Sequence, residues 1–514
     1  MKQNFLKDSV SNYLVYGLQL ALGVIAIPVY IHAFGDSLYG VYLLSLGLAS
    51  SLLFLEFGSG KSMLRYTAEY LADGDENKFA QAVKTCLAIT GVTSLAAAGI
   101  FFLLAYFRQT LFNIPAEYDE ESFWLLTITA GYAFILLAAQ LPQSMLRGAG
   151  IFYVRNKLVL VELFLRTAVV FSIWWWDMSI YFLLAAELFI VLISVIFDFV
   201  VLYRKVPHLL RMDFLRRPTT VPLLEGEVFQ YAKETFYLSA VGFFSQNSDR
   251  LLIGFFLDVR FVTVYTVITK PYAILKSALG KFYVVFTPYY VRILQHGGME
   301  TLKRFLVKFS AVSNFILSLL ILSGILALPS LVRLWLNTDA YDPYIIYGQI
   351  LVLIYTIRTL AVMFTSAMYV TGETRRLLTL EIVSVVINLA VSLALINLIG
   401  VGGVLIGTVV QLLVSVPYIL HLASNWLHEN RPLYDRGNGL SELLQRYLIN
   451  LGLGALVILV SYFLENYLEL SPLLHIATVL GIGSFILLSG GALRFRTTIT
   501  EMRRLRQKFF NKYD

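Results

Sequence analysis

The sequence predicts an all-α integral membrane protein with about fourteen transmembrane helices, arranged as two six-helix lobes plus two C-terminal helices. Three observations predict this fold class. Of the 514 residues, 58% are hydrophobic and only 14% are charged, whereas soluble domains have about 45–50% apolar and about 25% charged residues. Apolar runs of about 20 residues recur along the chain between short polar segments. Basic residues gather in alternate polar segments, as the positive-inside rule requires.

The apolar runs define the predicted spans. At a rise of 1.5 Å per residue, a helix of about 20 residues crosses a hydrocarbon layer of about 30 Å. The N-terminal MKQNFLKD leads directly into the first run without a small-residue cleavage site, so this run is predicted to be a retained helix. The predicted spans are 10–33, 38–57, 82–107, 123–141, 157–176, 179–203, 234–257, 261–287, 306–332, 343–370, 377–399, 401–424, 443–464 and 472–492.

Lysine and arginine predict the orientation of the spans. With the N-terminus in the cytoplasm, 31 of the 40 basic residues fall in cytoplasmic segments, and the opposite side has only Arg108, Arg260 and Arg333. Acidic residues gather on that outer side, as in AEYDEES (116–122) and NTDAYDP (337–343). Both termini are therefore predicted to be cytoplasmic. The net charge of +7 follows from this topology, and no nucleic-acid partner is expected.

Cofactor and metal sites are not predicted. The single cysteine, Cys86, excludes an intramolecular disulfide, and the six histidines have no metal-binding spacing. The segment GSGKS (58–62) resembles part of a phosphate-binding loop. However, the glycine that the full motif requires is replaced by Leu55, and a membrane helix rather than a strand precedes it.

Six basic residues fall within or at the ends of predicted spans. Each would cost about 3 kcal/mol at a lipid-facing helix centre, so most are expected to pair, to reach the interface or to line a polar interior. They are Arg166, Arg250, Lys270, Lys276, Lys281 and Arg358.

Four of these cations are predicted to bind substrate: Arg250, Lys270, Lys276 and Arg358. Ammonium and guanidinium groups suit phosphate or sugar-acid ligands. For Arg358 an ion pair between helices is an equal alternative, and for Arg250 a salt bridge between lobes is nearly equal. Lys281 is expected to extend to the cytoplasmic interface.

Two carboxylates are candidates for binding a coupling ion, Asp249 and Glu56. Asp249 and Arg250 are adjacent, and side chains about 100° apart on a helix do not face each other. Asp249 is therefore predicted to position Arg250 or to bind the ion. Glu56 closes the second predicted span, where an exposed or paired role is an equal alternative. Glu162 and Arg166, four residues apart, are predicted to neutralise each other structurally.

An internal repeat relates the two halves of the chain, because similar residues recur at offsets of 223 to 227. An even number of spans per unit gives lobes of like orientation, related by an axis along the membrane normal, and two such lobes around a central cavity are typical of an alternating-access transporter. The predicted segments are a first lobe at 1–230 with its connecting cytoplasmic loop at 204–230, a second lobe at 231–424, a loop and two helices at 425–492, and a basic tail at 493–514 that is predicted to lie on anionic lipid headgroups.

The sequence also resembles a known family along essentially its whole length. KETFYLSAVGFFSQNSDRLLIGFFLDVRFVTVYTV (233–267) is similar to the seventh and eighth helices of bacterial polysaccharide flippases, members of the multidrug/oligosaccharidyl-lipid/polysaccharide (MOP) exporter superfamily. The first helix pair (12–42) and the tenth-to-twelfth helix pattern (370–410), with Asn388 and its GxGG turn, are also similar. Related flippases have arginines in the first two helices, which this chain lacks.

The resemblance implies a flippase, not an enzyme, that moves an undecaprenyl-diphosphate-linked oligosaccharide from the cytoplasmic to the outer leaflet of the bacterial inner membrane. It also implies an ion gradient (H⁺ or Na⁺) as the driving force and no bound cofactor. Membrane lipid and the glycan assembly machinery are the further expected partners. The alternatives are a multidrug or lipid-II-type exporter of the same superfamily and, with less support, a membrane-embedded polysaccharide polymerase or glycosyltransferase.

Overall fold

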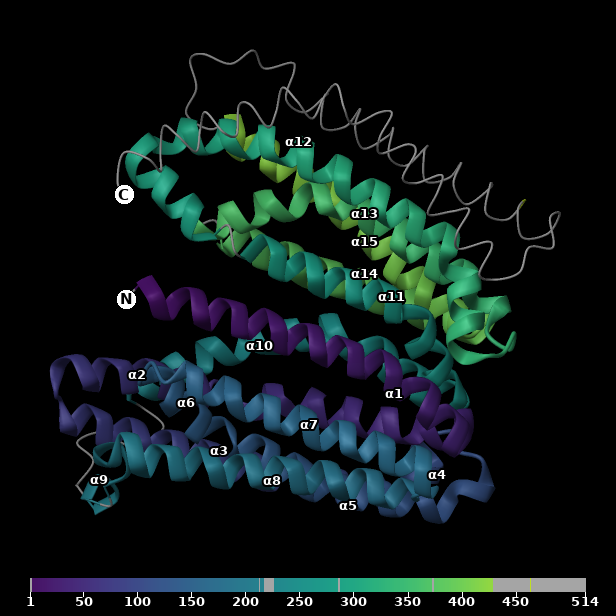
Figure 1. The fold of residues 1–514 in the computed structure, drawn as a ribbon, viewed down its shortest axis with the longest axis horizontal. Coiled ribbons are helices and arrows are strands. Elements are labelled where there is room, and N and C mark those ends of the chain that lie inside the picture. Colours follow the sequence, from purple (N-terminus) through teal and green to yellow (C-terminus); the bar gives the residue numbers. More distant parts are fainter. Residues whose placement is uncertain are drawn as a thin grey trace. The chain divides into compact units, whose positions relative to one another are not determined.

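The computed structural model describes residues 2–211, 213–216, 226–284, 287–371, 374–428 and 463. Every named element within these ranges is a helix, and their only β feature is an isolated bridge between Asn113 and Asp258. The all-α class predicted from the hydropathy pattern is therefore confirmed (Figure 1). The predicted spans at 443–464 and 472–492 and the basic tail lie outside the described residues, apart from Phe463.

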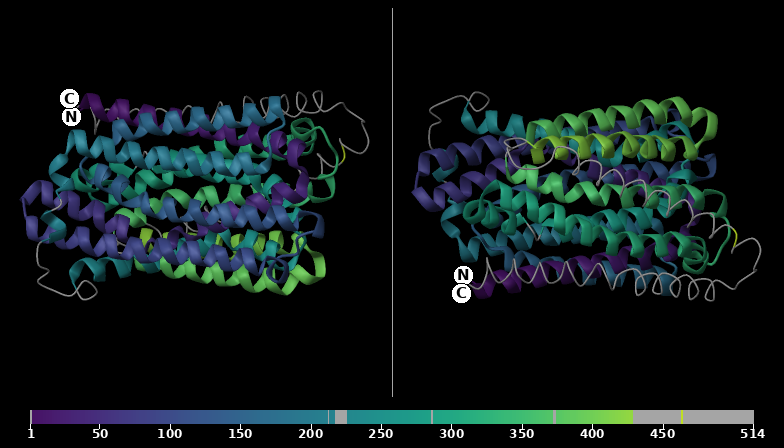
Figure 2. Two further views of the ribbon diagram at one scale, coloured as in Figure 1. Left: turned by 90° about the horizontal axis from the view of Figure 1, so that it is seen from below. Right: turned by 90° about the horizontal axis from the view of Figure 1, so that it is seen from above.

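The chain divides into two compact units between Tyr265 and Thr266. Within each unit the long helices run side by side, as Figure 2 shows from two further directions. The elements of the first unit are α1 (Lys2–Ser51), η1 (Leu52–Glu56), α2 (Ser59–Asp73), α3 (Glu76–Tyr106), α4 (Arg108–Leu111), η2 (Ala116–Tyr118), α5 (Asp119–Ala138), α6 (Gln140–Gly148), α7 (Phe152–Trp176), α8 (Ile180–Lys205), η3 (Pro207–Leu210), α9 (Asp213–Arg216), α10 (Glu227–Phe256) and the start of α11 (Arg260–Val284).

The described part of the second unit, up to residue 428, comprises the rest of α11 and four further helices. They are α12 (Thr287–Leu336), α13 (Asp342–Val370), α14 (Thr374–Ile399) and α15 (Val401–His428). The boundary between units differs from the predicted repeat boundary at 230/231 because α10 packs against α1 and α2 of the first unit. The unit boundary reflects which helices pack together, whereas the predicted lobes were defined by similar residues at a fixed offset. The unit boundary therefore does not test the lobes, and they remain a prediction.

Two long elements are each two helices joined at a glycine. In α1 the break is at Gly35, with φ 70° and ψ 170°, and in α12 it is at Gly298, with φ 72° and ψ 175°. Glycine adopts this region because it has no Cβ. The break at Gly35 falls between the predicted spans 10–33 and 38–57, so the sequence located this turn correctly.

Seven of the described segments are long and apolar enough to cross a membrane. They are Val15–Glu56, Glu76–Tyr106, Ala116–Gly148, Lys157–Trp176, Ile180–Lys205, Arg375–Ile399 and Val401–Ala423. Several carry exposed apolar side chains at helical spacing, such as Phe164 and Phe171 on α7 and Ile382, Val386 and Leu393 on α14. A multi-pass membrane protein needs such lipid-facing surfaces. The total of fourteen spans remains a prediction.

Small residues bring α14 and α15 close together. A Cβ on Gly403 would lie 2.6 Å from the backbone carbonyl oxygen of Leu395, and one on Gly407 would lie 3.0 Å from the carbonyl oxygen of Asn388. The Asn388 amide Nδ2 also donates to Thr408 Oγ1 at 3.1 Å. Small side chains that allow backbones to approach, together with an interhelical hydrogen bond, are typical of packing inside membranes.

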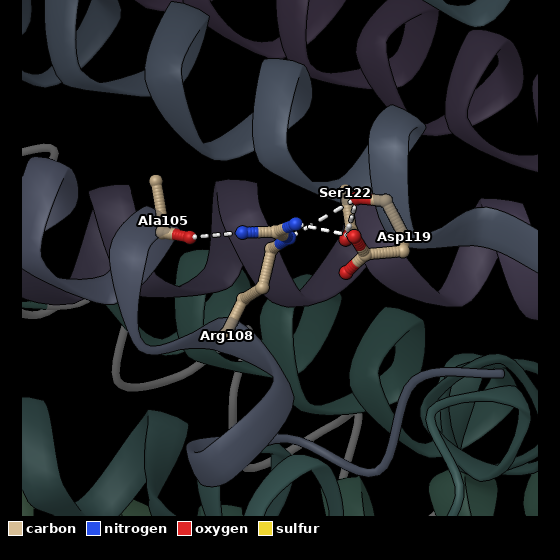
Figure 3. Close-up of polar contacts among 4 residues, drawn as sticks. All are labelled: Ala105, Arg108, Asp119 and Ser122. Atoms are coloured by element: carbon tan, nitrogen blue, oxygen red, sulfur yellow. Dashed lines mark hydrogen bonds and ion pairs between the residues drawn. The ribbon is translucent and has the colours of Figure 1, made fainter. Parts of the chain in front are cut away.

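All three arginines of the predicted outer side are paired with carboxylates. Arg108 donates to the Asp119 side chain and to the Ala105 carbonyl, so it links the end of α3 to the start of α5 (Figure 3). Arg333 Nη2 lies 2.6 Å from Asp342 Oδ2, and Arg260 Nε lies 3.9 Å from Asp258 Oδ2. These pairs neutralise the only basic residues that the orientation places outside.

At the predicted cytoplasmic end, α9 is held against the α2–α3 hairpin. The ring of Phe214 is buried and packs edge-on against Phe79, with ring centroids 5.2 Å apart. Arg211 lies 2.8 Å from Glu76 and 3.0 Å from Asp213. The first part of the predicted connecting loop is therefore anchored to the first unit.

Candidate functional site

A row of two cations and two tyrosines crosses the second unit, and we call it the cationic–aromatic row: Lys276 and Tyr272 on α11, Tyr355 and Arg358 on α13. The Lys276 ammonium lies 5.9 Å from the centroid of the Tyr272 ring. Tyr272 in turn packs edge-on against Tyr355, with centroids 5.2 Å apart. Arg358 follows Tyr355 by three residues, which places both on one face of α13. The contact between Tyr272 and Tyr355, which the sequence did not predict, thus links the helix that carries Lys276 to the helix that carries Arg358, two of the four predicted substrate-binding cations.

Arg358 also makes an ion pair between helices. Its Nη2 atom lies 3.4 Å from Glu381 Oε1 on α14, and both side chains are partly exposed. Ion pairing was one of the two predicted alternatives for Arg358. Glu381 was not predicted as its partner, although an acidic residue within the apolar span 377–399 is itself a signal, since intramembrane charges usually pair.

Lys270 lies six residues before Lys276 on α11, with Pro271 between them. This separation rotates the two side chains about 120° apart around the helix axis. Both side chains are partly buried, and both interact with other residues. Lys270 is therefore near the cationic–aromatic row in sequence but points in a different direction from Lys276.

Asp249 and Arg250 lie near the end of α10 in the first unit and point to different neighbours. Asp249 Oδ2 accepts a hydrogen bond of 2.7 Å from the Tyr265 hydroxyl on α11. The Cδ atom of Arg250 lies 3.8 Å from the position that a Cβ on Gly47 of α1 would occupy. The two side chains thus diverge, as their helical geometry predicts. The contact with Tyr265 makes Asp249 a local anchor within the first unit.

Glu56 is the last residue of η1, and α2 begins three residues later at Ser59. Its Oε1 atom accepts a 2.6 Å hydrogen bond from the backbone N–H of Gly60, one of the first amides of α2. The first four N–H groups of a helix have no intrahelical acceptor, and a carboxylate there also interacts favourably with the helix dipole. This contact favours the paired role for Glu56 over ion coupling.

A polar cluster that the sequence predicted only in part lies within the first unit. It consists of Glu162 and Arg166 on α7 and Glu187 and Ser194 on α8. Arg166 Nη2 lies 2.9 Å from Glu187 Oε2, and the Ser194 hydroxyl donates to Glu162. The predicted i, i+4 pairing omitted the stronger partner, Glu187. The sequence did contain a signal for Glu187, because an acidic residue within the predicted apolar span 179–203 needs a partner.

No metal site is evident among the described residues, which contain no group of three or more His, Cys, Asp or Glu side chains placed to hold an ion. The contacts in these sites are ionic, aromatic and hydrogen-bonding. Two fixed cations flanked by tyrosine rings suit an anionic ligand that also carries sugar or other ring surfaces.

No protein-family model matches the sequence, and no curated protein matches it either. Solved structures do match its fold. One is an inward-facing multidrug resistance MATE family transporter of the MOP superfamily, with a TM-score of 0.63 and 14% identity, covering 80% of this chain and 96% of that one. The lipid II flippase MurJ in an inward closed conformation matches with a TM-score of 0.62 and 13% identity, covering 89% of this chain and 98% of that one.

A MOP superfamily transporter from Pyrococcus furiosus matches with a TM-score of 0.57 and 14% identity, covering 82% of this chain and 95% of that one. The chain therefore has the fold of MOP superfamily transporters. These neighbours are transporters and flippases, not enzymes.

Proposed function

We propose that this chain is a flippase that moves a lipid-linked oligosaccharide, attached through a diphosphate, from the cytoplasmic to the outer leaflet by alternating access. The observation that supports it most directly is the cationic–aromatic row. Charged side chains inside a membrane protein are costly and are typically retained for function. A row of cations and tyrosine rings provides the groups that a phosphate and a sugar require.

The proposed setting is the bacterial inner membrane, with both termini in the cytoplasm. The distribution of basic residues supports this orientation. The ion pairs of Arg108, Arg260 and Arg333 support it further, because they leave the outer side of the described residues without an uncompensated arginine. Membrane lipid and glycan assembly enzymes are the partners that this function requires.

A lipid-II-type or multidrug exporter is the second candidate, and the fold of the neighbours supports it equally. A lipid-II-type substrate also has a diphosphate, so the cationic–aromatic row is compatible with it. A multidrug exporter of organic cations fits less well, because Lys276 and Arg358 would repel a cationic drug. A polymerase or glycosyltransferase is disfavoured by the short predicted outer segments and by a fold whose solved relatives are transporters.

Reconstitution tests the proposal. The full chain is placed in proteoliposomes with an undecaprenyl-diphosphate oligosaccharide, and the glycan that becomes accessible on the opposite leaflet is measured. Lys270→Ala, Lys276→Ala and Arg358→Ala are expected to abolish transport while leaving the amount of membrane-inserted protein unchanged. Arg375→Ala, at the exposed start of α14, is the control and should transport normally.

Wild-type transport by all three variants would overturn the cationic site. Failure of the wild-type chain to move the oligosaccharide lipid, together with transport of lipid II or of a drug in the same vesicles, would favour the second candidate. Collapsing the proton gradient while the sodium gradient is kept identifies the coupling ion of whichever substrate is moved.

A further inference from the structure

Phe57, between η1 and α2, has a backbone conformation that its side chain disfavours. Its φ is 52°, in the left-handed region, and Gly58 follows it with φ 70°. Within the described ranges, the other non-glycine residues with a positive φ are Asp177 and Asn337. Aspartate and asparagine tolerate this region because their short polar side chains form local hydrogen bonds, whereas a bulky residue there is strained. For a residue with a Cβ, the left-handed state is disfavoured by roughly 5–30-fold.

Aromatic rings from α10 hold Phe57 in this conformation. The Phe57 ring stacks on Phe236 with ring centroids 4.5 Å apart, and on Phe229 with centroids 5.8 Å apart. Phe54 on η1 also contacts the Phe236 ring, with centroids 5.8 Å apart. We call these four residues the phenylalanine clasp. Each such aromatic pair favours the stacked state by about 2–13-fold, so the two contacts of Phe57 are similar in size to the backbone cost that they offset.

The strained residue lies where the chain passes from one set of helices to another. Before it, α1 packs against α5, α7 and α10, whereas α2 after it packs chiefly against α3 and α6. Only Phe57 and Gly58 separate η1 from α2. The backbone at these two residues therefore sets the direction in which α2 leaves α1.

Two further contacts stabilise the same arrangement. The backbone N–H of Gly60 donates to Glu56, which joins the two sides of the junction. The Arg65 guanidinium lies 4.8 Å from the centroid of the Tyr231 ring, which joins α2 to α10 directly. The N-terminal end of α10 is thus attached both to the strained junction and to the helix that follows it.

We infer that Phe57 is a conformational switch whose state is set by the N-terminal end of α10. With the phenylalanine clasp closed, stacking selects the left-handed backbone. When the rings of α10 withdraw, Phe57 relaxes to an ordinary negative φ, and α2 leaves η1 in a different direction. Strained residues that their neighbours hold in place are typical of such switch regions. The use of this switch during transport rests on the proposed function, whereas the switch itself does not.

Two substitutions at position 57 separate backbone strain from ring packing. Phe57→Ala and Phe57→Gly both remove the ring, but only glycine adopts a positive φ without cost. Spin labels on Ala68→Cys of α2 and Gln230→Cys of α10, both exposed positions, report the distance between these helices. The measurement uses the full chain in nanodiscs, with Cys86→Ser removing the native thiol.

The protein with Phe57 should show one distance. Phe57→Ala should add a second distance, whereas Phe57→Gly should keep the first, because the contacts of Glu56 and Arg65 remain and the backbone cost is gone. The ratio of the two states should differ by roughly 5–30-fold between these variants. Identical distance distributions for Phe57→Ala and Phe57→Gly would overturn the switch.

A matched pair of variants on α10 tests the clasp from its other side. Phe236→Leu removes the closest ring contact and should shift the ratio toward the second distance by about 2–13-fold. Phe255→Leu removes a similar contact at the other end of α10, where its ring lies 5.0 Å from that of Phe112, and should leave the distance unchanged. This pair carries the test by itself if Phe57→Ala does not fold, and equal distributions in the two variants would then overturn the switch.

The role in transport is tested by fixing α2 to α10. Arg65→Cys and Tyr231→Cys are joined by a cleavable bifunctional reagent in proteoliposomes. Transport should fall severalfold on cross-linking and recover when the reagent is cleaved. Transport that cross-linking does not change would overturn the role in transport while the spin-label result stands. If the wild-type chain moves no oligosaccharide lipid, the proposed function fails, and the spin-label result is unaffected.

Discussion

Exchanging the charges of Arg358 and Glu381 separates the two roles that the structure allows Arg358. In the variant Arg358→Glu with Glu381→Arg, the ion pair between α13 and α14 is kept and its polarity is reversed. A structural role needs only the pair. A substrate role needs a cation at position 358, beside Tyr355 in the cationic–aromatic row.

The distance sets the scale of the pairing. At 3.4 Å, two unit charges attract by about 5 kcal/mol at an effective dielectric constant of about 20. Desolvation and side-chain entropy offset most of this, and the side chains are 21% and 37% exposed. We therefore expect a net coupling of about 1 kcal/mol. Arg358→Glu alone should lower stability by about 1–3 kcal/mol, because it places two carboxylates together.

Thermal unfolding in nanodiscs measures stability, and proteoliposome transport measures function. We expect the exchanged variant to recover most of the stability that Arg358→Glu loses and to remain unable to transport. Glu381→Ala keeps the cation and should transport more than either variant that lacks it. Full transport by the exchanged variant would show that Arg358 acts only through its ion pair, and the substrate role would be refuted.

Three further predictions concern the helix packing and one exposed ion pair. Gly403→Ala should destabilise by about 1–3 kcal/mol, because its Cβ would lie 2.6 Å from the backbone of α14, whereas Gly324→Ala, with open space around it, should not lower the Tm. Phe214→Ala should release the segment around α9, so protease should cleave it several-fold faster than in the wild-type protein; equal rates would refute the anchoring. The pKa of Glu69 lies below its usual value, chiefly through its hydrogen bond to Lys78. Its stabilisation of under about 1 kcal/mol is present above an unfolded pKa of about 4.3 and is lost as the pH falls through the lower folded pKa. The Tm of a Glu69→Gln variant should therefore lie below that of the wild type at pH values above about 4.3, and the two Tm values should converge as the pH falls through the folded pKa.

The helices were predictable because membrane insertion imposes a length and a composition on each one. The runs at 82–107 and 179–203 correspond closely to α3 and α8. Polar helical segments were missed for the same reason, since hydropathy alone does not reveal them. The clearest case is α2, which lies within a stretch predicted only as a cytoplasmic segment. The first part of α12, from Thr287 to the break at Gly298, is a second case.

The predicted site residues show where sequence reasoning stops. Hydropathy identifies which charges are expensive, so Arg166 and Arg358 were selected correctly as residues that need compensation. Their partners, Glu187 and Glu381, are on neighbouring helices, and a single sequence contains no information about which faces of two helices meet. Aromatic contacts such as Tyr272 with Tyr355 depend on the same unknown rotation.

The i, i+4 spacing of Glu162 and Arg166 shows why a local rule can mislead inside a membrane. On an exposed helix such a pair stabilises the helix by only about 0.2–0.5 kcal/mol. This is too little to prevent the arginine from pairing with a better-placed carboxylate on another helix. Within the first unit, α7 turns Arg166 toward Glu187, and the Ser194 hydroxyl meets Glu162. The sequence pair therefore becomes a cluster of three charges. A charge inside a membrane is therefore compensated by residues of a neighbouring helix as well as by those of its own, and a rule that looks along one helix finds only part of the set.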